Sequence, residues 1–215
     1  DGQGWYRLGM CFHRLKRFDE SAAALERARG LQPGNAELGY FLGASLLQLG
    51  RVEEAVTALA AAAAAKPDDP AIHAALGVGH AQLGHLEDAL TAYTEAARLG
   101  MDDLQIHLNI GRLSERLYRY DEMARAFQKV VGLDANLVEG HRKLGWALAR
   151  LGRQNEALSP YQQAVLLSPN DGNIRFELGM CYATLGNARA AMGQVQALRT
   201  IDPSRAAELE RAIQQ

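Results

Sequence analysis

The sequence predicts an all-α array of helical hairpins, and three observations support this prediction. A Leu-Gly or Ile-Gly pair recurs every 34 residues, at 8–9, 42–43, 76–77, 110–111, 144–145 and 178–179. Each interval contains two apolar stretches with helical spacing. In four of the six intervals a glycine separates these stretches, as is common at a helix C-terminus; these glycines are Gly50, Gly84, Gly152 and Gly186.

The interval divides residues 1–205 into six repeat units, each predicted to be one helix-turn-helix hairpin. Helix starts are marked by Asn35, Asp69, Asp103 and Asp171, which stand just before the first helix of the next unit. A side-chain oxygen there can accept hydrogen bonds from free backbone N–H groups. The predicted units are 2–35, 36–69, 70–103, 104–137, 138–171 and 172–205.

Residues 206–215 are predicted to form a C-terminal capping helix. Ala206, Leu209 and Ile213 share one helical face, whereas the charged residues lie largely off it. A helix with one apolar face and one solvent-exposed polar face is expected at the end of a repeat array, because each hairpin exposes an apolar face that only a neighbour can cover. We therefore expect a right-handed superhelical solenoid of twelve repeat helices plus one capping helix.

The repeated residues resemble the tetratricopeptide repeat (TPR) family, and the resemblance covers essentially the whole chain. Unit one carries the pattern as Trp5, Leu8-Gly9, Phe12, Phe18, Leu25, Ala28 and Pro33. Unit five carries it as His141, Leu144-Gly145, Leu148, Gly152, Ala157, Tyr161, Ala164 and Pro169. The chain departs from the pattern at the turn glycine, which is Lys16 in unit one and Tyr118 in unit four, and at the proline, which is Met101 and Ala135 in two units. We expect less regular turns in units one and four.

Composition argues against recognition by overall charge. The net charge is −2, with 23 Lys and Arg against 25 Asp and Glu, so no overall field attracts nucleic acid or an anionic membrane. The run Val56–Ala65, which is free of charge and of strong polarity, falls short of the roughly 20 residues that a membrane span needs. A composition rich in alanine, leucine and arginine is typical of a bacterial protein.

Two cysteines, Cys11 and Cys181, lie five units apart in the predicted array, too far to form a disulfide within one molecule. Two unpaired thiols slightly favour the cytoplasm, and the bacterial periplasm remains an alternative. Both cysteines occupy matching places in their units, where small buried residues are normal, so we expect both in the core.

No motif in the sequence predicts an enzyme, a cofactor or a metal site. The chain lacks a phosphate-binding loop, a Gly-x-Ser-x-Gly elbow, a Cys-x-x-Cys pair and a His-Glu-x-x-His helix. His73, His107 and His141 recur at the 34-residue interval, but neighbouring copies are expected about 8–10 Å apart, too far to share one zinc ion. We interpret them as packing residues.

The family resemblance implies a partner-binding groove along the inner face, lined by the first helix of each unit. Its first half is predicted to be apolar and roomy, with Leu47 and the small residues Ala71, Ala74, Ala75 and Val78 beside the larger Tyr6, Met10, Tyr40 and Phe41. Its second half is predicted to be cationic and aromatic, with Asn109, Arg112, Arg116, Arg142, Lys143, Trp146, Arg150 and Phe176. Arginine side chains bind carboxylates and stack on rings, so an acidic partner segment is expected there. Glu115, Glu139 and Glu177 lie in the same area and could neutralise part of this charge.

The leading functional hypothesis is a scaffold that binds a peptide or a segment of a partner protein in this groove. Two alternatives remain open from the sequence. The chain could be the substrate-recruiting arm of a larger enzyme, or a structural protein that associates with its own copies. A full-length gene would decide the first alternative, and a solution mass would decide the second.

Overall fold

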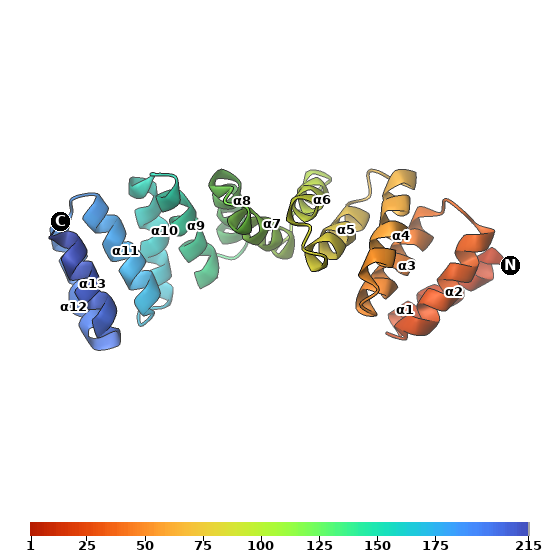
Figure 1. The fold of residues 1–215 in the computed structure, drawn as a ribbon, viewed down its shortest axis with the longest axis horizontal. Helices are drawn as coiled ribbons and strands as arrows, with labels where there is room; N and C mark the ends of the chain where they lie inside the picture. Colours follow the sequence, from red (N-terminus) through yellow and green to blue (C-terminus); the bar gives the residue numbers. More distant parts are fainter. Residues whose placement is uncertain (215) are drawn as a thin grey trace. The chain divides into compact units, whose positions relative to one another are not determined.

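The computed structural model describes residues 1–214, which form thirteen helices and, within that range, no strand. The chain divides into two compact units, one from Asp1 to Asn109 and one from Ile110 onward, with helix α7 running across the division (Figure 1). The helices of the first unit are α1 (Gly2–Arg14), α2 (Phe18–Leu31), α3 (Ala36–Gln48), α4 (Val52–Ala65), α5 (Pro70–Gln82), α6 (Leu86–Arg98) and the first part of α7 (Leu104–Arg116). Those that follow are α8 (Tyr120–Leu133), α9 (Val138–Arg150), α10 (Gln154–Leu167), α11 (Gly172–Thr184), α12 (Ala188–Ile201) and α13 (Pro203–Ile213).

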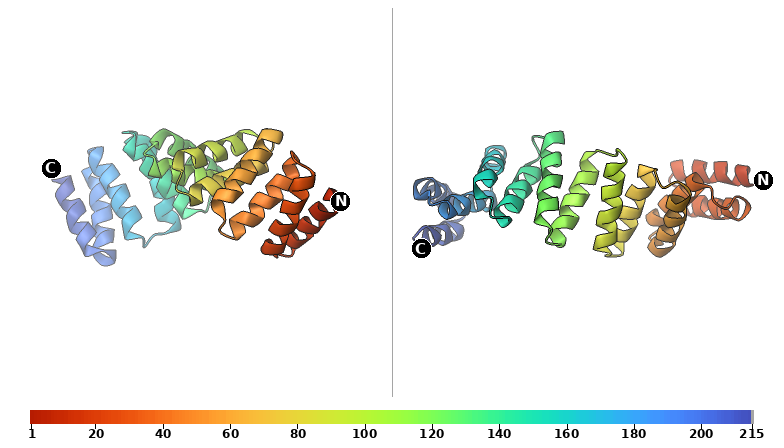
Figure 2. Two further views of the ribbon diagram at one scale, coloured as in Figure 1. Left: turned by 45° about the vertical axis from the view of Figure 1, so that its right-hand side comes forward. Right: turned by 90° about the horizontal axis from the view of Figure 1, so that it is seen from above.

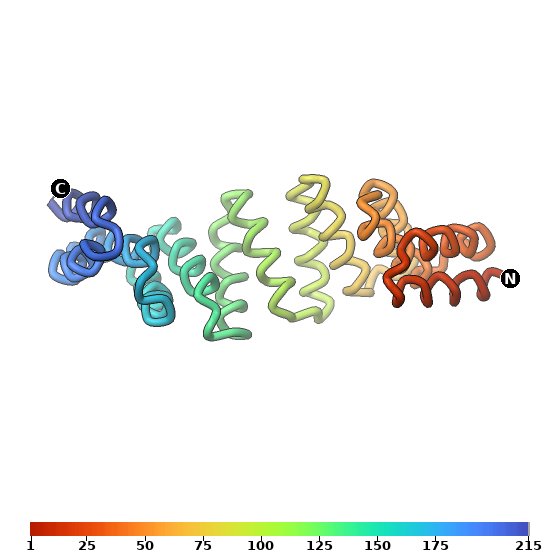
Figure 3. Tube along the Cα trace, turned by 90° about the horizontal axis from the view of Figure 1, so that it is seen from below, coloured from red at the N-terminus to blue at the C-terminus, as the bar shows by residue number. Residues whose placement is uncertain are grey.

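Within each unit, successive helices pair as hairpins and each hairpin packs on the next. In the first unit α1 packs on α2, α3 on α4 and α5 on α6, and α2 and α4 also contact the hairpin that follows. In the second unit the same pattern joins α9 with α10 and α11 with α12 (Figures 2 and 3). The all-α class and the hairpin architecture predicted from the sequence are confirmed.

The glycine of each Leu-Gly pair lets the two helices of a hairpin come close together. A Cβ atom added to Gly77 would lie 2.8 Å from the ring of Tyr93 on α6, and one added to Gly145 would lie 2.9 Å from the ring of Tyr161 on α10. Cβ atoms in proteins essentially never lie closer than 3.0 Å to such a heavy atom. The missing side chain therefore admits the large residue that fills the centre of the hairpin.

The four predicted N-cap residues all accept hydrogen bonds at the start of a first helix. Asn35 caps the amide of Leu38, and Asp69 and Asp171 cap the starts of α5 and α11 in the same way. Asp103 Oδ1 accepts from the amide of Ile106 at 3.0 Å. These side chains satisfy backbone donors that have no partner inside the helix.

The turns of the first and fourth hairpins are as regular as the others, so the expectation of less regular turns is wrong. Lys16 and Tyr118 both adopt a left-handed backbone with φ 59°, and the glycines at matching places have φ between 72° and 76°. The closing hydrogen bond is also the same, from Arg17 N to Phe12 O and from Arg119 N to Ser114 O. The packing of the hairpin imposes the left-handed conformation even on residues with a Cβ atom.

The capping helix α13 begins at Pro203, earlier than the predicted start at residue 206. Its Ala206 and Leu209 are buried against α11 and α12. A Cβ atom at Gly179 would collide with Leu209. In the last hairpin a leucine from α13 thus fills the space beside the glycine, which in other hairpins is filled from the second helix.

The two cysteines have different environments, which corrects the expectation that both lie in the core. Cys181 is buried, with its Sγ 3.3 Å from the carbonyl of Gln154 on the preceding hairpin, but Cys11 is exposed. Leu8 is likewise 40% exposed, whereas the matching Leu42 is fully buried. The reason is that this face of a first helix packs on the preceding hairpin, and no described helix precedes α1.

Candidate partner-binding groove

An open apolar groove of about 350 Å³ lies in the first unit, between α3 and α5. We call it the α5 groove. Its lining comes from four successive stretches of chain, with the largest share on first helices of the hairpins. The lining residues are Tyr40, Ala44, Leu47, Gln48, Ala71, Ala74, Ala75, Val78, Tyr93, Met101, Asp103, Gln105, Ile106 and Asn109.

The floor of the α5 groove is formed by small side chains on one face of α5. Ala71, Ala74, Ala75 and Val78 follow one another at spacings of three, one and three residues, so they share a helix face. All are at least partly exposed, and Val78 is 36% exposed. The roominess predicted for this region thus corresponds to a hollow with a wide alanine floor.

Larger and polar side chains form the walls of the α5 groove. Tyr40 and Leu47 from α3 are half-buried and pack against the core beneath the floor. Gln48, Gln105 and Asn109 supply amide groups that can both donate and accept hydrogen bonds. The groove can therefore bury an apolar side chain and offer hydrogen bonds to the backbone that carries it.

The other residues predicted for the apolar half lie beneath or beside this groove. Tyr6 is only 5% exposed and belongs to the core between the first two hairpins. Burial raises the pKa of Tyr6, and the nearby carboxylate of Glu37 raises it further. Met10 and Phe41 are half-buried against the same core, and the ring of Phe41 meets that of Tyr40 edge to face at 5.3 Å. Tyr6 therefore offers a partner little surface, while Phe41 supports Tyr40.

In the second unit, three of the five predicted cations form ion pairs between first helices. The Arg112 guanidinium lies 2.8 Å from Glu139, and Lys143 Nζ lies 2.6 Å from Glu115. Both pairs join α7 to α9. The bonds from Glu139 hold the pKa of Arg112 above its ordinary value.

The third pair joins α9 to α11 and, like the pair of Lys143 with Glu115, is partly shielded from solvent. Arg142 Nη2 lies 2.6 Å from Glu177 Oε1, and side-chain exposure is 37% for the arginine and 18% for the glutamate. Hydrogen bonding to Glu177 raises the pKa of Arg142. The carboxylates named in the sequence analysis thus neutralise much of the predicted cationic surface.

Two predicted cations keep their charge available to a ligand. Within residues 1–214, Arg116 and Arg150 have no ion-pair partner, and both are exposed. The Arg150 guanidinium lies 5.3 Å from the ring centroid of Tyr120 and 5.8 Å from that of Trp146. These two rings meet edge to face at 5.4 Å, so Arg150, Tyr120 and Trp146 form one aromatic-cationic cluster.

The predicted site residue Phe176 makes contacts other than those of that cluster. Its ring is half-buried against the core formed with α12 and α13, and the Arg205 guanidinium lies 5.1 Å above it. Neither Tyr120 nor Arg205 was predicted to be part of a site. The family resemblance directs attention to first helices, whereas Tyr120 opens a second helix and Arg205 lies in the capping helix.

The recurring histidines make hydrogen bonds to the loop that precedes their own helix, a local role beyond the packing expected from the sequence. His73 Nε2 lies 2.7 Å from the carbonyl oxygen of Pro67, and His141 Nε2 lies 2.9 Å from that of Ala135. In the last repeat Arg175 occupies the matching place and donates to the carbonyl of Pro169. In the third, fifth and sixth repeats, the side chain at this place therefore ties the first helix to the loop before it.

Comparisons with known proteins match this architecture along nearly the whole chain. Family models described as tetratricopeptide repeat match residues 12–78, 74–137 and 141–206. No curated protein sequence matches the chain. Among the helices of residues 1–214, none has the length and apolarity needed to cross a lipid bilayer.

Solved structures resemble the chain in fold. The structure of YrrB, titled as a TPR protein with an unusual peptide-binding site, has a TM-score of 0.74 at 20% identity and covers 88% of this chain and 99% of its own. A MamA structure from AMB-1 has a TM-score of 0.69 at 20% identity, covering 78% of this chain and 92% of its own. The Naa15/Naa10 complex bound to HypK-THB has a TM-score of 0.78 at 14% identity, covering 99% of this chain and 33% of the matched chain.

Proposed function

This chain belongs to the tetratricopeptide repeat family, which supports a role as a protein-interaction scaffold, and we propose that it holds a short segment of a partner protein in the α5 groove. One observation carries the proposal, namely an open hollow of about 350 Å³ with a floor of alanine side chains and walls of Tyr40 and Leu47. Concave, mostly apolar sites with a few polar groups are where proteins bind ligands.

The lining of the α5 groove defines the chemistry of the bound segment. Burying apolar surface contributes roughly 25 cal/mol per Å², so an apolar or aromatic anchor residue suits the alanine floor. The amides of Gln48, Gln105 and Asn109 suit the backbone of an extended peptide, which presents both donors and acceptors. The peptide-binding site named for YrrB, a protein of similar fold, supports the same mode of use.

The proposal is tested by selecting peptides from a random library against the intact chain and measuring their affinities for two matched variants. Ala74→Arg places a long charged side chain on the groove floor. Ala64→Arg makes the same change on α4, at an exposed place outside the groove lining. We expect selected peptides to share an apolar or aromatic residue, Ala74→Arg to weaken their binding at least tenfold, and Ala64→Arg to leave it unchanged.

Equal affinities for the two variants would show that the peptides bind elsewhere, and the α5 groove would lose its proposed role. Circular dichroism of both variants checks that the helices are retained. Because alanine and arginine are both good helix formers, neither substitution should unfold its helix.

We also propose that acidic residues of the partner contact the second unit at the cluster of Arg150, Tyr120 and Trp146. Arg150 lies over both rings and has no ion-pair partner in the described chain, so its donors can bind a carboxylate. An Arg150→Glu variant should lose affinity for an acidic peptide, and the loss should shrink as salt rises. Arg153→Glu, at the N-cap position of α10, is the control, because that arginine is already paired with Glu156. If both variants bind the acidic peptide as tightly as the wild type, the cluster is not a contact area.

A further inference from the structure

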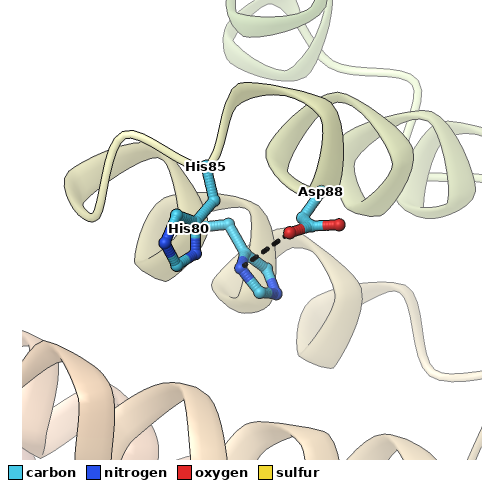
Figure 4. A group of neighbouring side chains, drawn as sticks. All are labelled: His80, His85 and Asp88. Carbon is cyan, nitrogen blue, oxygen red and sulfur yellow. Dashed lines mark ion pairs between the residues drawn. The ribbon is translucent and has the colours of Figure 1, made fainter.

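The turn between α5 and α6 brings two imidazoles and a carboxylate together (Figure 4). His80 lies in the last turn of α5, His85 is the N-cap residue of α6, and Asp88 lies in the first turn of α6. One donor atom from each side chain lies within 4.8 Å of the other two. His80 Nδ1 is 4.0 Å from Asp88 Oδ2, and the two imidazole centroids are 6.0 Å apart.

This hairpin differs from its neighbours at the places of His85 and Asp88. Four other hairpins carry an Arg-Glu ion pair there, three residues apart. These pairs are Arg17 with Glu20, Arg51 with Glu54, Arg119 with Glu122, and Arg153 with Glu156. Guanidinium groups do not bind metal ions, whereas imidazole and carboxylate groups are metal ligands. The third hairpin alone replaces both members of the pair by such ligands.

His80 is the one imidazole at its place in the six hairpins. Of the matching residues, Leu46 and Leu148 are apolar and buried, and Ser114 is polar and buried. The Nδ1 atom of His80 is buried as well, but it has no hydrogen-bond partner in the described part of the chain. A buried polar atom without a partner lowers stability. A ligand that engages Nδ1 would remove this cost.

We propose that His80, His85 and Asp88 bind a divalent transition-metal ion, and that Zn²⁺ fits them best. Two imidazoles and one carboxylate are a common ligand set for zinc, with bonds of about 2.0–2.2 Å and a fourth position left for water. Around such an ion the donor atoms lie roughly 3.3 Å apart. His85 and Asp88 are exposed, so their side chains have room to rotate toward that spacing.

The bound ion would join the end of α5 to the start of α6. Because α5 provides the floor of the α5 groove, the ion would stabilise the hairpin on which the groove is built. The site itself lies outside the groove lining, so metal binding can be tested whether or not the groove binds a peptide.

The test is a calorimetric titration of the intact chain with Zn²⁺, accompanied by thermal unfolding with and without the ion. We expect one strong site per chain and a rise in Tm of roughly 5 °C at a Zn²⁺ concentration 100 times the dissociation constant, reversed by a chelator. Two variants restore the residues of the other hairpins and should fold well. His85→Arg regains the arginine-carboxylate pair, and His80→Leu regains the buried leucine.

Both variants should lose the site, with affinity reduced at least tenfold, and His80→Leu should keep or raise the Tm of the metal-free chain. His73→Gln serves as the matched control, because His73 lies on the same helix but bonds to the carbonyl of Pro67. The proposal fails if the wild type shows no saturable Zn²⁺ binding. It also fails if the His80 and His85 variants bind as the wild type does, or if His73→Gln removes the site to the same extent.

Discussion

Replacing Tyr118 by glycine should stabilise the chain, although it removes a large side chain. Tyr118 has φ 59°, in the left-handed region that costs a residue with a Cβ atom roughly 1–2 kcal/mol. The side chain is 76% exposed, and its nearest ring, Tyr120, lies at a centroid distance of 6.4 Å. Little packing is therefore lost when the ring is removed.

The magnitude follows from two opposing contributions. Glycine relieves the backbone cost of roughly 1–2 kcal/mol, and its greater freedom in the unfolded chain returns about 0.5–1 kcal/mol. The net gain for Tyr118→Gly is about 0.5–1 kcal/mol. It should appear in urea unfolding as a higher midpoint with an unchanged m-value, because the surface exposed on unfolding is nearly the same.

The reverse change can be made in the next repeat, within the same compact unit of the chain. Gly152 occupies the matching place with φ 74°, and a Cβ atom added there would meet no heavy atom within 4 Å. Gly152→Ala should therefore lower stability by about 1 kcal/mol through the backbone alone. If Tyr118→Gly lowered the midpoint while Gly152→Ala did not, the left-handed conformation would not be the source of either effect.

Two further predictions concern packing inside the hairpins. Gly145→Ala should lower the free energy of unfolding by about 1–3 kcal/mol because its Cβ would press on the Tyr161 ring. Gly193→Ala, which has open space and a helical backbone, should raise the free energy of unfolding by about 0.5–1 kcal/mol. Equal urea midpoints for the two variants would contradict both expectations. Amide hydrogen exchange should be faster in α4, whose buried residues are mostly alanine, than in α8, which buries Met, Phe and Val side chains. Slower exchange in α4 than in α8 would contradict this.

The fold was largely predictable because the repeat states the same information six times. A Leu-Gly pair, a turn and a cap recur at one spacing. The other repeats therefore still identify a hairpin in which one residue departs from the pattern. The turns at Lys16 and Tyr118 illustrate this, because local preference disfavours a left-handed backbone there. The packing of neighbouring helices overrides that preference, which is a long-range effect that single-residue patterns do not contain.

The candidate site was predictable where it depends on helix faces and not where it depends on the pairing of side chains. The floor residues of the α5 groove share one helix face, and the sequence analysis named them from the family resemblance, which implies a groove along the first helices. By contrast, the pairing of Arg142 with Glu177 depends on the distance between α9 and α11 and on rotamers at both ends. The cluster at His80 was missed because its members lie on two helices joined by a turn, where spacing along one helix gives no guide.

The first two hairpins share a buried polar network that should make them sensitive to acid. His13 Nδ1 lies 2.9 Å from Ser45 Oγ, and its ring packs edge to face with Phe18 and Phe41 at 5.6 and 5.5 Å. Ser45 Oγ donates to the carbonyl of Phe41, and Ser21 Oγ donates to the carbonyl of Gly9. Ser21 Oγ also lies 2.9 Å from Ser45 Oγ, so His13, Ser45 and Ser21 form one continuous hydrogen-bonded chain.

Burial lowers the pKa of His13 below its ordinary value of 6.5 because the imidazolium loses hydration between the two rings. The unfolded chain therefore binds a proton at a higher pH than the folded chain does. The stabilising contribution of neutral His13 is complete above pH 6.5, and it is lost as the pH falls from there through the folded pKa. Urea midpoints should consequently decrease as the pH is lowered from 7.5 to 5.5.

His13→Asn, which keeps a nitrogen donor but cannot titrate, should flatten this dependence, whereas His141→Asn on α9 should leave it as in the wild type. An NMR titration that places His13 at or above 6.5, or an unchanged pH dependence in His13→Asn, would show that the network does not exclude the charged imidazole.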